Sequence, residues 1–141
     1  MMPRLKVIVA DHEVVTQQDT TNFCNYIIRV VDDDASDDKF SFFTIEDRYS
    51  SLREFAAAVK RDIGSNNDSS FLFSFPKKKL WGNMEPQFIE QRKLQLQCFF
   101  NEFFALRPVY ACPLVPAYLI SKSTGAQSTK VIKNLFRGAD F

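Results

Sequence analysis

The sequence predicts an α+β fold: a three-stranded antiparallel β-meander packed against a helical subdomain of three or more helices. Two observations predict it. Segments rich in β-branched and aromatic residues fill the first third of the chain, and apolar residues at helical spacing dominate the remainder. A proline-containing extended loop is expected between the first two helices. The chain has 141 residues and 15 phenylalanines, which is enough for one domain with its own core.

The predicted strands follow one another at the start of the chain. Residues 5–9, 26–31 and 40–45 have the composition of strands, and three consecutive strands of this kind favour an antiparallel meander. The acidic run 32–38 is typical of a solvated hairpin connection. It lacks the glycine and the terminal glutamate of an EF-hand loop, so no metal site is expected there.

The first helix is expected to begin at a capping box formed by Ser51 and Glu54. Its apolar residues recur at helical spacing. They are Leu52, Phe55, Ala56, Val59 and Ile63. A polar loop, 64–70, ends this helix. The segment 71–79 is expected to be extended, because Pro76 biases the residue before it toward extended geometry.

A second, longer helix is expected to begin near Pro86, since proline suits the first helical turn. Its apolar stripe consists of Phe88, Ile89, Leu96, Phe99, Phe100 and Phe103. Residues 113–120 are a candidate third helix. The domain is therefore expected to span residues 4–120. Residues 121–141 are expected to be a linker or a short amphipathic helix, which docks on the domain, frays or touches a membrane.

Catalytic and metal-binding patterns are missing from the sequence. The single histidine, His12, accompanies no nucleophile, zinc or phosphate-loop motif, so no enzyme, catalytic residue or cofactor is expected. The three cysteines are widely spaced without a CxxC pattern, which indicates small buried hydrophobes in a reducing, cytoplasmic compartment. No apolar run approaches the roughly 18 residues that span a bilayer.

Charge is segregated along the chain. Residues 11–47 carry ten acids and two bases, a net −8, whereas residues 48–93 carry nine bases and five acids, a net +4. The whole chain is nearly neutral, at +1, and its basic patch is short, so nucleic acid is not an expected partner. The acidic first third is a candidate surface for a basic protein partner.

Two arginines occupy positions that suit an anion. Arg92 lies four residues from both Phe88 and Leu96, so helical spacing places it on the apolar face, where a cation needs a counter-charge. That counter-charge is either a bound anion or a loop carboxylate, and the other alternative is that the side chain snorkels to solvent. Arg48 and Tyr49 stand where the third strand gives way to the first helix. Helix N-termini favour anions, and an arginine there can hold a phosphate through two hydrogen bonds.

A run of three lysines, 77–79, follows Pro76, and Leu80, Trp81 and Met84 come directly or shortly after it. Basic residues beside large apolar ones are typical of a membrane-interface element, in which charge attracts anionic lipid and the apolar groups insert. The alternative is that Leu80 and Trp81 cover the core of the domain itself.

These segments, in this order, resemble the phox homology (PX) domain family, and within it the phosphoinositide-binding, sorting-nexin-like members. The likeness covers about residues 4–120. It depends on the stretches 47–52 (DRYSSL), 75–83 (FPKKKLWGN) and 88–93 (FIEQRK), with Leu96 and Phe99 behind the last. Each motif alone has modest specificity, and their shared order and spacing make the combination specific.

The resemblance implies a set of headgroup contacts. In family members that bind phosphatidylinositol 3-phosphate, Arg48 matches the arginine that holds the 3-phosphate, and Tyr49 matches the aromatic residue beneath the inositol ring. Lys78 matches the lysine on the 1-phosphate, and Arg92 matches the arginine that bonds the hydroxyl groups at positions 4 and 5. Further candidates are Ser50, Lys77 and Lys79, of which Lys79 is the alternative to Lys78.

The chain departs from the family pattern at three positions. Asp47 stands where the family often has a second arginine, Lys77 replaces the second proline, and Leu52 replaces an aromatic residue. None of the matched contact residues is lost. Lys77 and Lys93 are spare lysines that suit an additional phosphate on the ring.

The expected function is therefore recognition of phosphatidylinositol 3-phosphate by a cytoplasmic protein, peripheral on endosomal or vacuolar membranes, in membrane trafficking and protein transport. Leu80, Trp81 and Met84 are the expected membrane contacts. The other interpretation is a PX-like protein–protein interaction module with weak or no lipid binding.

Overall fold

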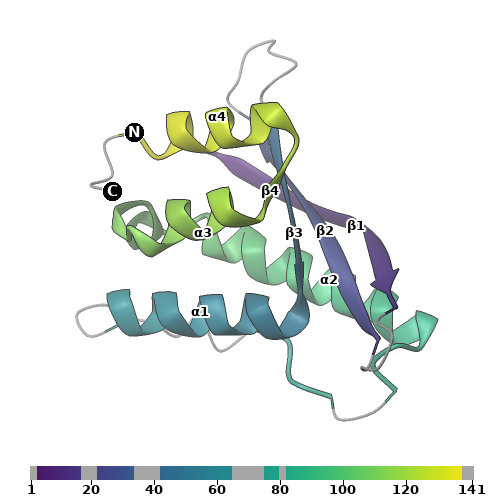
Figure 1. The fold of residues 1–141 in the computed structure, drawn as a ribbon. Coiled ribbons are helices and arrows are strands. Elements are labelled where there is room, and N and C mark those ends of the chain that lie inside the picture. Colours follow the sequence, from purple (N-terminus) through teal and green to yellow (C-terminus); the bar gives the residue numbers. More distant parts are fainter. Residues whose placement is uncertain (1–2, 17–21, 34–41, 65–74, 80–81, 138–141) are drawn as a thin grey trace.

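The computed structural model places an antiparallel sheet on one side of the molecule and helices on the other (Figure 1). It describes residues 3–16, 22–33, 42–64, 75–79 and 82–137. The predicted α+β class is confirmed. No helix within these ranges is long and apolar enough to cross a membrane.

The sheet has four strands in the order β1 (Leu5–Val15), β2 (Phe23–Asp32), β3 (Phe42–Arg48) and β4 (Ser123–Thr124). The first three form the predicted meander, with antiparallel pairing between successive strands. A register shift in β1 after Ile8 marks a bulge. The fourth strand was not predicted, because two residues cannot show an alternating pattern.

In the described ranges the helices are α1 (Tyr49–Ile63), α2 (Pro86–Phe103), the short 3-10 helix η2 (Arg107–Ala111), α3 (Leu114–Lys122) and α4 (Ala126–Leu135). The prediction that α2 begins at its proline is confirmed. The predicted capping box of the first helix is wrong. The helix begins two residues before the predicted cap, directly from the end of β3, and its N-cap residue makes no side-chain capping bond.

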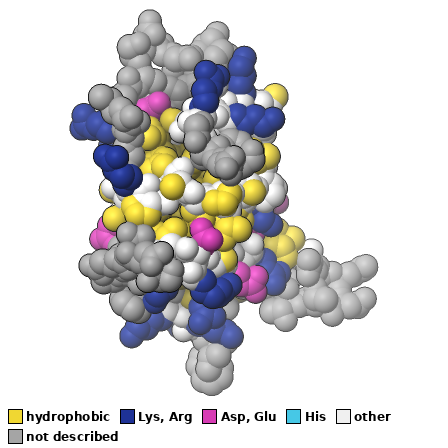
Figure 2. All heavy atoms as spheres, turned by 90° about the vertical axis from the view of Figure 1, so that its left-hand side faces the viewer, with side chains coloured by type: hydrophobic (Ala, Val, Ile, Leu, Met, Phe, Trp, Pro, Cys, Tyr) yellow, Lys and Arg dark blue, Asp and Glu magenta, His cyan; other side chains and the backbone are white. Residues whose placement is uncertain are grey.

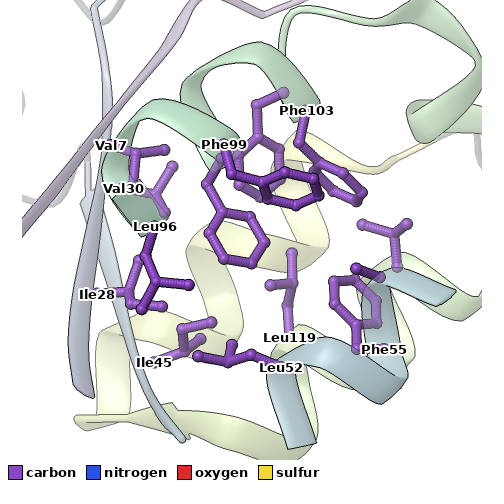
Figure 3. Close-up of a cluster of buried hydrophobic side chains, with 14 of the residues drawn as sticks. Val7, Ile28, Val30, Ile45, Leu52, Phe55, Leu96, Phe99, Phe103 and Leu119 are labelled. Atoms are coloured by element: carbon purple, nitrogen blue, oxygen red, sulfur yellow. The ribbon is translucent and has the colours of Figure 1, made fainter. Parts of the chain in front are cut away.

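The hydrophobic core fills the space between the inner face of the sheet and the helices (Figure 3). Its labelled side chains come from β1, β2, β3, α1, α2 and α3 and are Val7, Ile28, Val30, Ile45, Leu52, Phe55, Leu96, Phe99, Phe103 and Leu119. All five predicted apolar residues of α1 are buried, and so is the predicted stripe of α2 except Phe88, which is half-buried. Periodicity therefore identified the faces that build this core.

The C-terminal segment packs against β3 (Figure 1). Gly125, with φ at +86°, provides the turn between β4 and α4. The Ser128 hydroxyl accepts the Thr44 backbone N–H (3.1 Å) and ties the helix to the strand. Ile132 and Phe136 are almost completely buried. The segment expected as a linker or a short amphipathic helix thus forms a strand and a docked helix.

Helix α2 runs along the outer edge of β1. Asn101 Oδ1 accepts the Val7 backbone N–H (2.8 Å), and its Nδ2 donates to the Val7 carbonyl (3.3 Å). Gln97 Oε1 accepts the Val9 N–H (3.0 Å). Lys93, one turn earlier, donates to a backbone carbonyl further along the strand (3.1 Å). Side chains spaced four residues apart therefore satisfy edge groups that have no neighbouring strand.

Basic and apolar side chains are also segregated on the surface. In Figure 2, lysine and arginine side chains gather above and below a band of hydrophobic side chains.

The cysteines differ in exposure: Cys24 and Cys112 are buried, whereas Cys98 is exposed on α2. The expectation that each cysteine is buried is therefore wrong for Cys98, because it lies on the helix face opposite the core.

Candidate functional site

A pocket of about 440 Å³ opens where β3 gives way to α1, facing the proline segment. It brings together the four principal predicted residues, which lie in three separate stretches of the chain. The predicted residues that line it are Arg48, Tyr49, Ser50, Lys78, Lys79, Met84 and Arg92. Lys77 lines a neighbouring hollow instead. Leu80 and Trp81 lie outside the residues that the structure describes.

Arg48 is the last residue of β3 and the N-cap of α1, with extended backbone geometry. Its side chain is exposed at the pocket wall. Its Nε donates to the Ser50 hydroxyl (2.9 Å), and its guanidinium lies 4.9 Å from the Phe23 ring centroid. The guanidinium is therefore held beside the unpaired N–H groups of the first turn of α1, an arrangement that favours an anion.

Asp47 points away from this pocket into the protein. Its Oδ1 accepts the Arg48 backbone N–H (2.9 Å), and its Oδ2 accepts a hydrogen bond from the Tyr118 hydroxyl. Lys122 Nζ lies 3.6 Å from the same carboxylate. The alternation of a β-strand turns Asp47 inward and Arg48 outward. Asp47, which departs from the family pattern, is therefore hydrogen-bonded inside the fold and does not line the pocket.

Tyr49 is half-buried at the start of α1. Its hydroxyl donates to the Pro76 carbonyl (2.6 Å), which ties the helix to the proline segment. The guanidinium carbon of Arg92 lies 3.7 Å from the centroid of the Tyr49 ring, a cation–π contact. Burial raises the pKa of Tyr49, although the nearby guanidinium groups of Arg92 and Arg53 act in the opposite direction.

Arg92 is buried, with only 3% of its surface exposed. Its Nη2 donates to the Lys77 carbonyl (2.8 Å), and its guanidinium also lies 4.4 Å from the Phe88 ring centroid. Burial lowers its pKa from the ordinary value, and the nearby Tyr26 and Tyr49 oppose that change. Among the described residues, no carboxylate pairs with Arg92, and its buried Nε has no hydrogen-bond partner. The described residues therefore show no loop carboxylate that pairs with Arg92, which was the alternative to a bound anion.

The lysines of the proline segment are all exposed but have different surroundings. Lys78 lines the pocket and the neighbouring hollow. Lys79 Nζ lies 4.4 Å from the Phe88 ring centroid. Lys93, the other spare lysine, is buried and bonds to Glu90 Oε2 (2.7 Å) as well as to β1. Lys93 does not line the pocket, and its ammonium group is already bonded, so the structure gives no support to the suggestion that Lys93 serves an additional phosphate.

Several pocket residues were not identified from the sequence. They are Asn22, Phe23, Cys24, Tyr26, Arg53, Glu54 and Asn83. Helical spacing could have identified Arg53, because it follows Tyr49 by four residues and therefore lies on the same face of α1. Phe23 has no such signal, because its position beside Arg48 depends on how β2 pairs with β3.

Comparison with known families agrees with this architecture. A family model for the PX domain matches residues 37–122, more than half of the chain. The chain therefore belongs to the PX domain family. A comparison with curated proteins found no match. PX domains are lipid-binding modules and generally not enzymes, so membership indicates phosphoinositide binding, peripheral membrane association and a general role in membrane trafficking.

Proposed function

We propose that this protein binds phosphatidylinositol 3-phosphate and thereby associates with endosomal or vacuolar membranes as a cytoplasmic, peripheral membrane protein in protein transport. One observation carries the proposal. Arg48, Tyr49, Lys78 and Arg92 come from three separate stretches of the chain and line one pocket. No acidic residue stands in the first turn of α1 to compete with a phosphate.

Each residue has a distinct role in this proposal. Arg48 holds the 3-phosphate, assisted by the N-terminus of α1. Lys78 meets the 1-phosphate from the proline segment, with Lys79 beside it. Arg92 reaches the hydroxyl groups at positions 4 and 5, and a hydroxyl oxygen would give its unpaired Nε an acceptor.

Tyr49 supports both the inositol ring and the guanidinium group of Arg92. The Arg92 guanidinium lies over one face of the Tyr49 ring, 3.7 Å from its centroid. Because the guanidinium covers one face of the Tyr49 ring, the inositol ring would stack on the other face, and Arg92 fixes the orientation of the tyrosine. Membrane contact is assigned to Met84, which lines the pocket and is half-buried, together with Leu80 and Trp81.

Vesicle co-sedimentation tests the proposal. Neutral vesicles that carry one phosphoinositide at a time are mixed with the wild type, with Arg48→Gln and with Arg61→Gln. Arg61 is an exposed arginine on the same helix that lines neither hollow, so its variant loses the same charge elsewhere. A charge-assisted hydrogen bond contributes about 1.5–3 kcal/mol, so Arg48→Gln should weaken binding to phosphatidylinositol 3-phosphate by roughly 10- to 100-fold.

Two results would contradict the proposal. One is equal pelleting of Arg48→Gln and Arg61→Gln, which would mean general charge attraction. The other is no pelleting of the wild type with any phosphoinositide, which would favour the interpretation as a protein–protein interaction module.

A further inference from the structure

We propose that Phe88 is a positioning residue of the headgroup pocket, whose aromatic ring holds Lys79 and Arg92 in place before a ligand binds. Phe88 is not among the described residues that line the pocket, whereas Lys79 and Arg92 both line it. Any effect of Phe88 on binding therefore passes through these two cations. Because they belong to the pocket of the proposed function, this inference depends on that function.

The Phe88 ring contacts both cations. Its centroid lies 4.4 Å from Lys79 Nζ and 4.4 Å from the guanidinium carbon of Arg92, which is within the range of cation–π attraction. Phe88 and Arg92 stand four residues apart on α2, so helical geometry places them on the same face. One ring therefore joins a cation of the proline segment to a cation of the helix.

The turn at Gly82 lets Lys79 reach this ring. Gly82 has φ at +74°, a conformation that favours glycine, and it lies between Lys79 and the start of α2. A Cβ atom added at Gly82 would lie 3.4 Å from both Cε and Nζ of Lys79. The lysine side chain therefore packs against bare backbone at the turn, with its ammonium group over Phe88.

An aromatic ring holds a cation without cancelling its charge. A carboxylate would also fix the position of a lysine or arginine, but it would neutralise the charge that a phosphate needs. Among the described residues, no carboxylate forms an ion pair with Lys79 or Arg92. Both cations therefore keep their charge for the pocket. A side chain that is ordered in advance also loses less conformational entropy when the ligand arrives, which raises affinity.

The exposure of Phe88 agrees with this role. It is the one member of the predicted apolar stripe of α2 that is half-buried, whereas the others are buried in the core. Part of its ring is therefore available to the cations, and the fold should tolerate a smaller apolar side chain there.

The test replaces the ring and keeps the apolar character. Binding to vesicles with phosphatidylinositol 3-phosphate, and to the free headgroup inositol 1,3-bisphosphate, is measured for the wild type, Phe88→Leu and Phe88→Tyr. Phe88→Leu should weaken both by roughly 3- to 12-fold, since ordering one long side chain on binding costs a factor of about 2 to 12. Phe88→Tyr keeps an aromatic face and should stay within about twofold of the wild type.

Phe42→Leu is the matched control. Phe42 is also half-buried and also has an arginine over its ring, since the Arg29 guanidinium lies 4.5 Å from its centroid. It stands at the opposite end of β3 from Arg48 and lines neither hollow. Its substitution therefore removes the same kind of contact away from the pocket, and binding should change by less than about twofold. Circular dichroism checks that each variant is folded.

Two measurements separate positioning from a purely structural role. In nuclear magnetic resonance spectra of the ligand-free wild type, the ring current of Phe88 should shift the Lys79 methylene protons beside the ammonium group upfield from those of the other lysines. The shift should disappear in Phe88→Leu and persist in Phe88→Tyr. In a Lys79→Gln background, Phe88→Leu should weaken binding less than it does alone, because one of its two cations is gone.

The inference is overturned if Phe88→Leu has no more effect than Phe42→Leu, or if Phe88→Tyr loses as much affinity as Phe88→Leu. Lys79 protons without an upfield shift in the wild type, or additive losses for Phe88→Leu and Lys79→Gln, would also overturn it. Arg48→Gln identifies failure of the proposed function. If Arg48→Gln weakens binding while Phe88→Leu matches its control, the pocket binds the headgroup without help from Phe88. If the wild type binds no phosphoinositide, the proposed function is wrong and the inference fails with it.

Discussion

Removing the buried carboxylate of Asp47 should loosen the turn that presents Arg48. Asp47→Ala takes the acceptor away from the Arg48 backbone N–H and from the Tyr118 hydroxyl. Hydrogen bonds to a charged group contribute about 1.5–3 kcal/mol each, and water reaches part of the half-buried Tyr118, so we expect a loss of about 3 kcal/mol in the free energy of unfolding. Lys122 adds little, since a partly exposed ion pair contributes about 0–1 kcal/mol.

Urea denaturation followed by circular dichroism measures this loss. For a slope of about 2 kcal/mol per M, the midpoint should fall by roughly 1.5 M. Asp47→Asn keeps one acceptor oxygen and should lose about half as much. Tyr118→Phe removes one of the two donors, so the double variant Asp47→Ala with Tyr118→Phe should be less unstable than the sum of the single variants. Glu13→Ala, which removes an exposed carboxylate from β1, is the control.

The same variant connects stability to binding. With the Arg48 amide released, Asp47→Ala should also weaken phosphoinositide binding under conditions where the protein remains folded. The reasoning is refuted if Asp47→Ala lowers the urea midpoint no more than Glu13→Ala does. Additive effects of the Asp47 and Tyr118 substitutions would refute the assigned pairing.

Two further predictions concern packing and cysteine reactivity. Ile132→Ala should lower the free energy of unfolding by about 2–5 kcal/mol, because the side chain is fully buried. The control Lys133→Ala removes an exposed side chain and should change this free energy by less than about 0.5 kcal/mol. Equal effects of the two substitutions in thermal denaturation would mean that α4 does not contribute to the core. With Ellman's reagent, Cys98 should react quickly in the native protein, whereas Cys24 and Cys112 should react slowly, because burial hides both thiols and raises their pKa, to about 11 for Cys112. Equal rates for all three thiols would contradict this assignment.

Helical periodicity predicted most of the fold because it records which residues face the core. The apolar stripes of α1 and α2 were identified residue by residue, and Pro86 marked where α2 begins. The start of α1 was misplaced for a physical reason. Its N-terminus follows β3 without a loop, and the Arg48 amide is bonded by the side chain of Asp47 rather than by a capping residue inside the helix.

The site was predictable only in part. Arg92 was identified because a cation on an apolar face needs a partner, and that argument uses the sequence of one helix. The inward pairing of Asp47 with Tyr118 joins β3 to α3, and the contact of Arg48 with Phe23 joins two strands. Such contacts depend on tertiary arrangement, which no local pattern encodes.

The contact between α2 and β1 has a consequence for self-association. An unpaired strand edge is a template on which another chain can add a strand, and proteins gathered on a membrane meet one another at high local concentration. Here Asn101 and Gln97 already occupy the backbone groups of Val7 and Val9. An incoming strand would have to displace both side chains first. This stretch of the sheet therefore resists β-strand addition, and the helix that provides Arg92 to the pocket is the element that shields it.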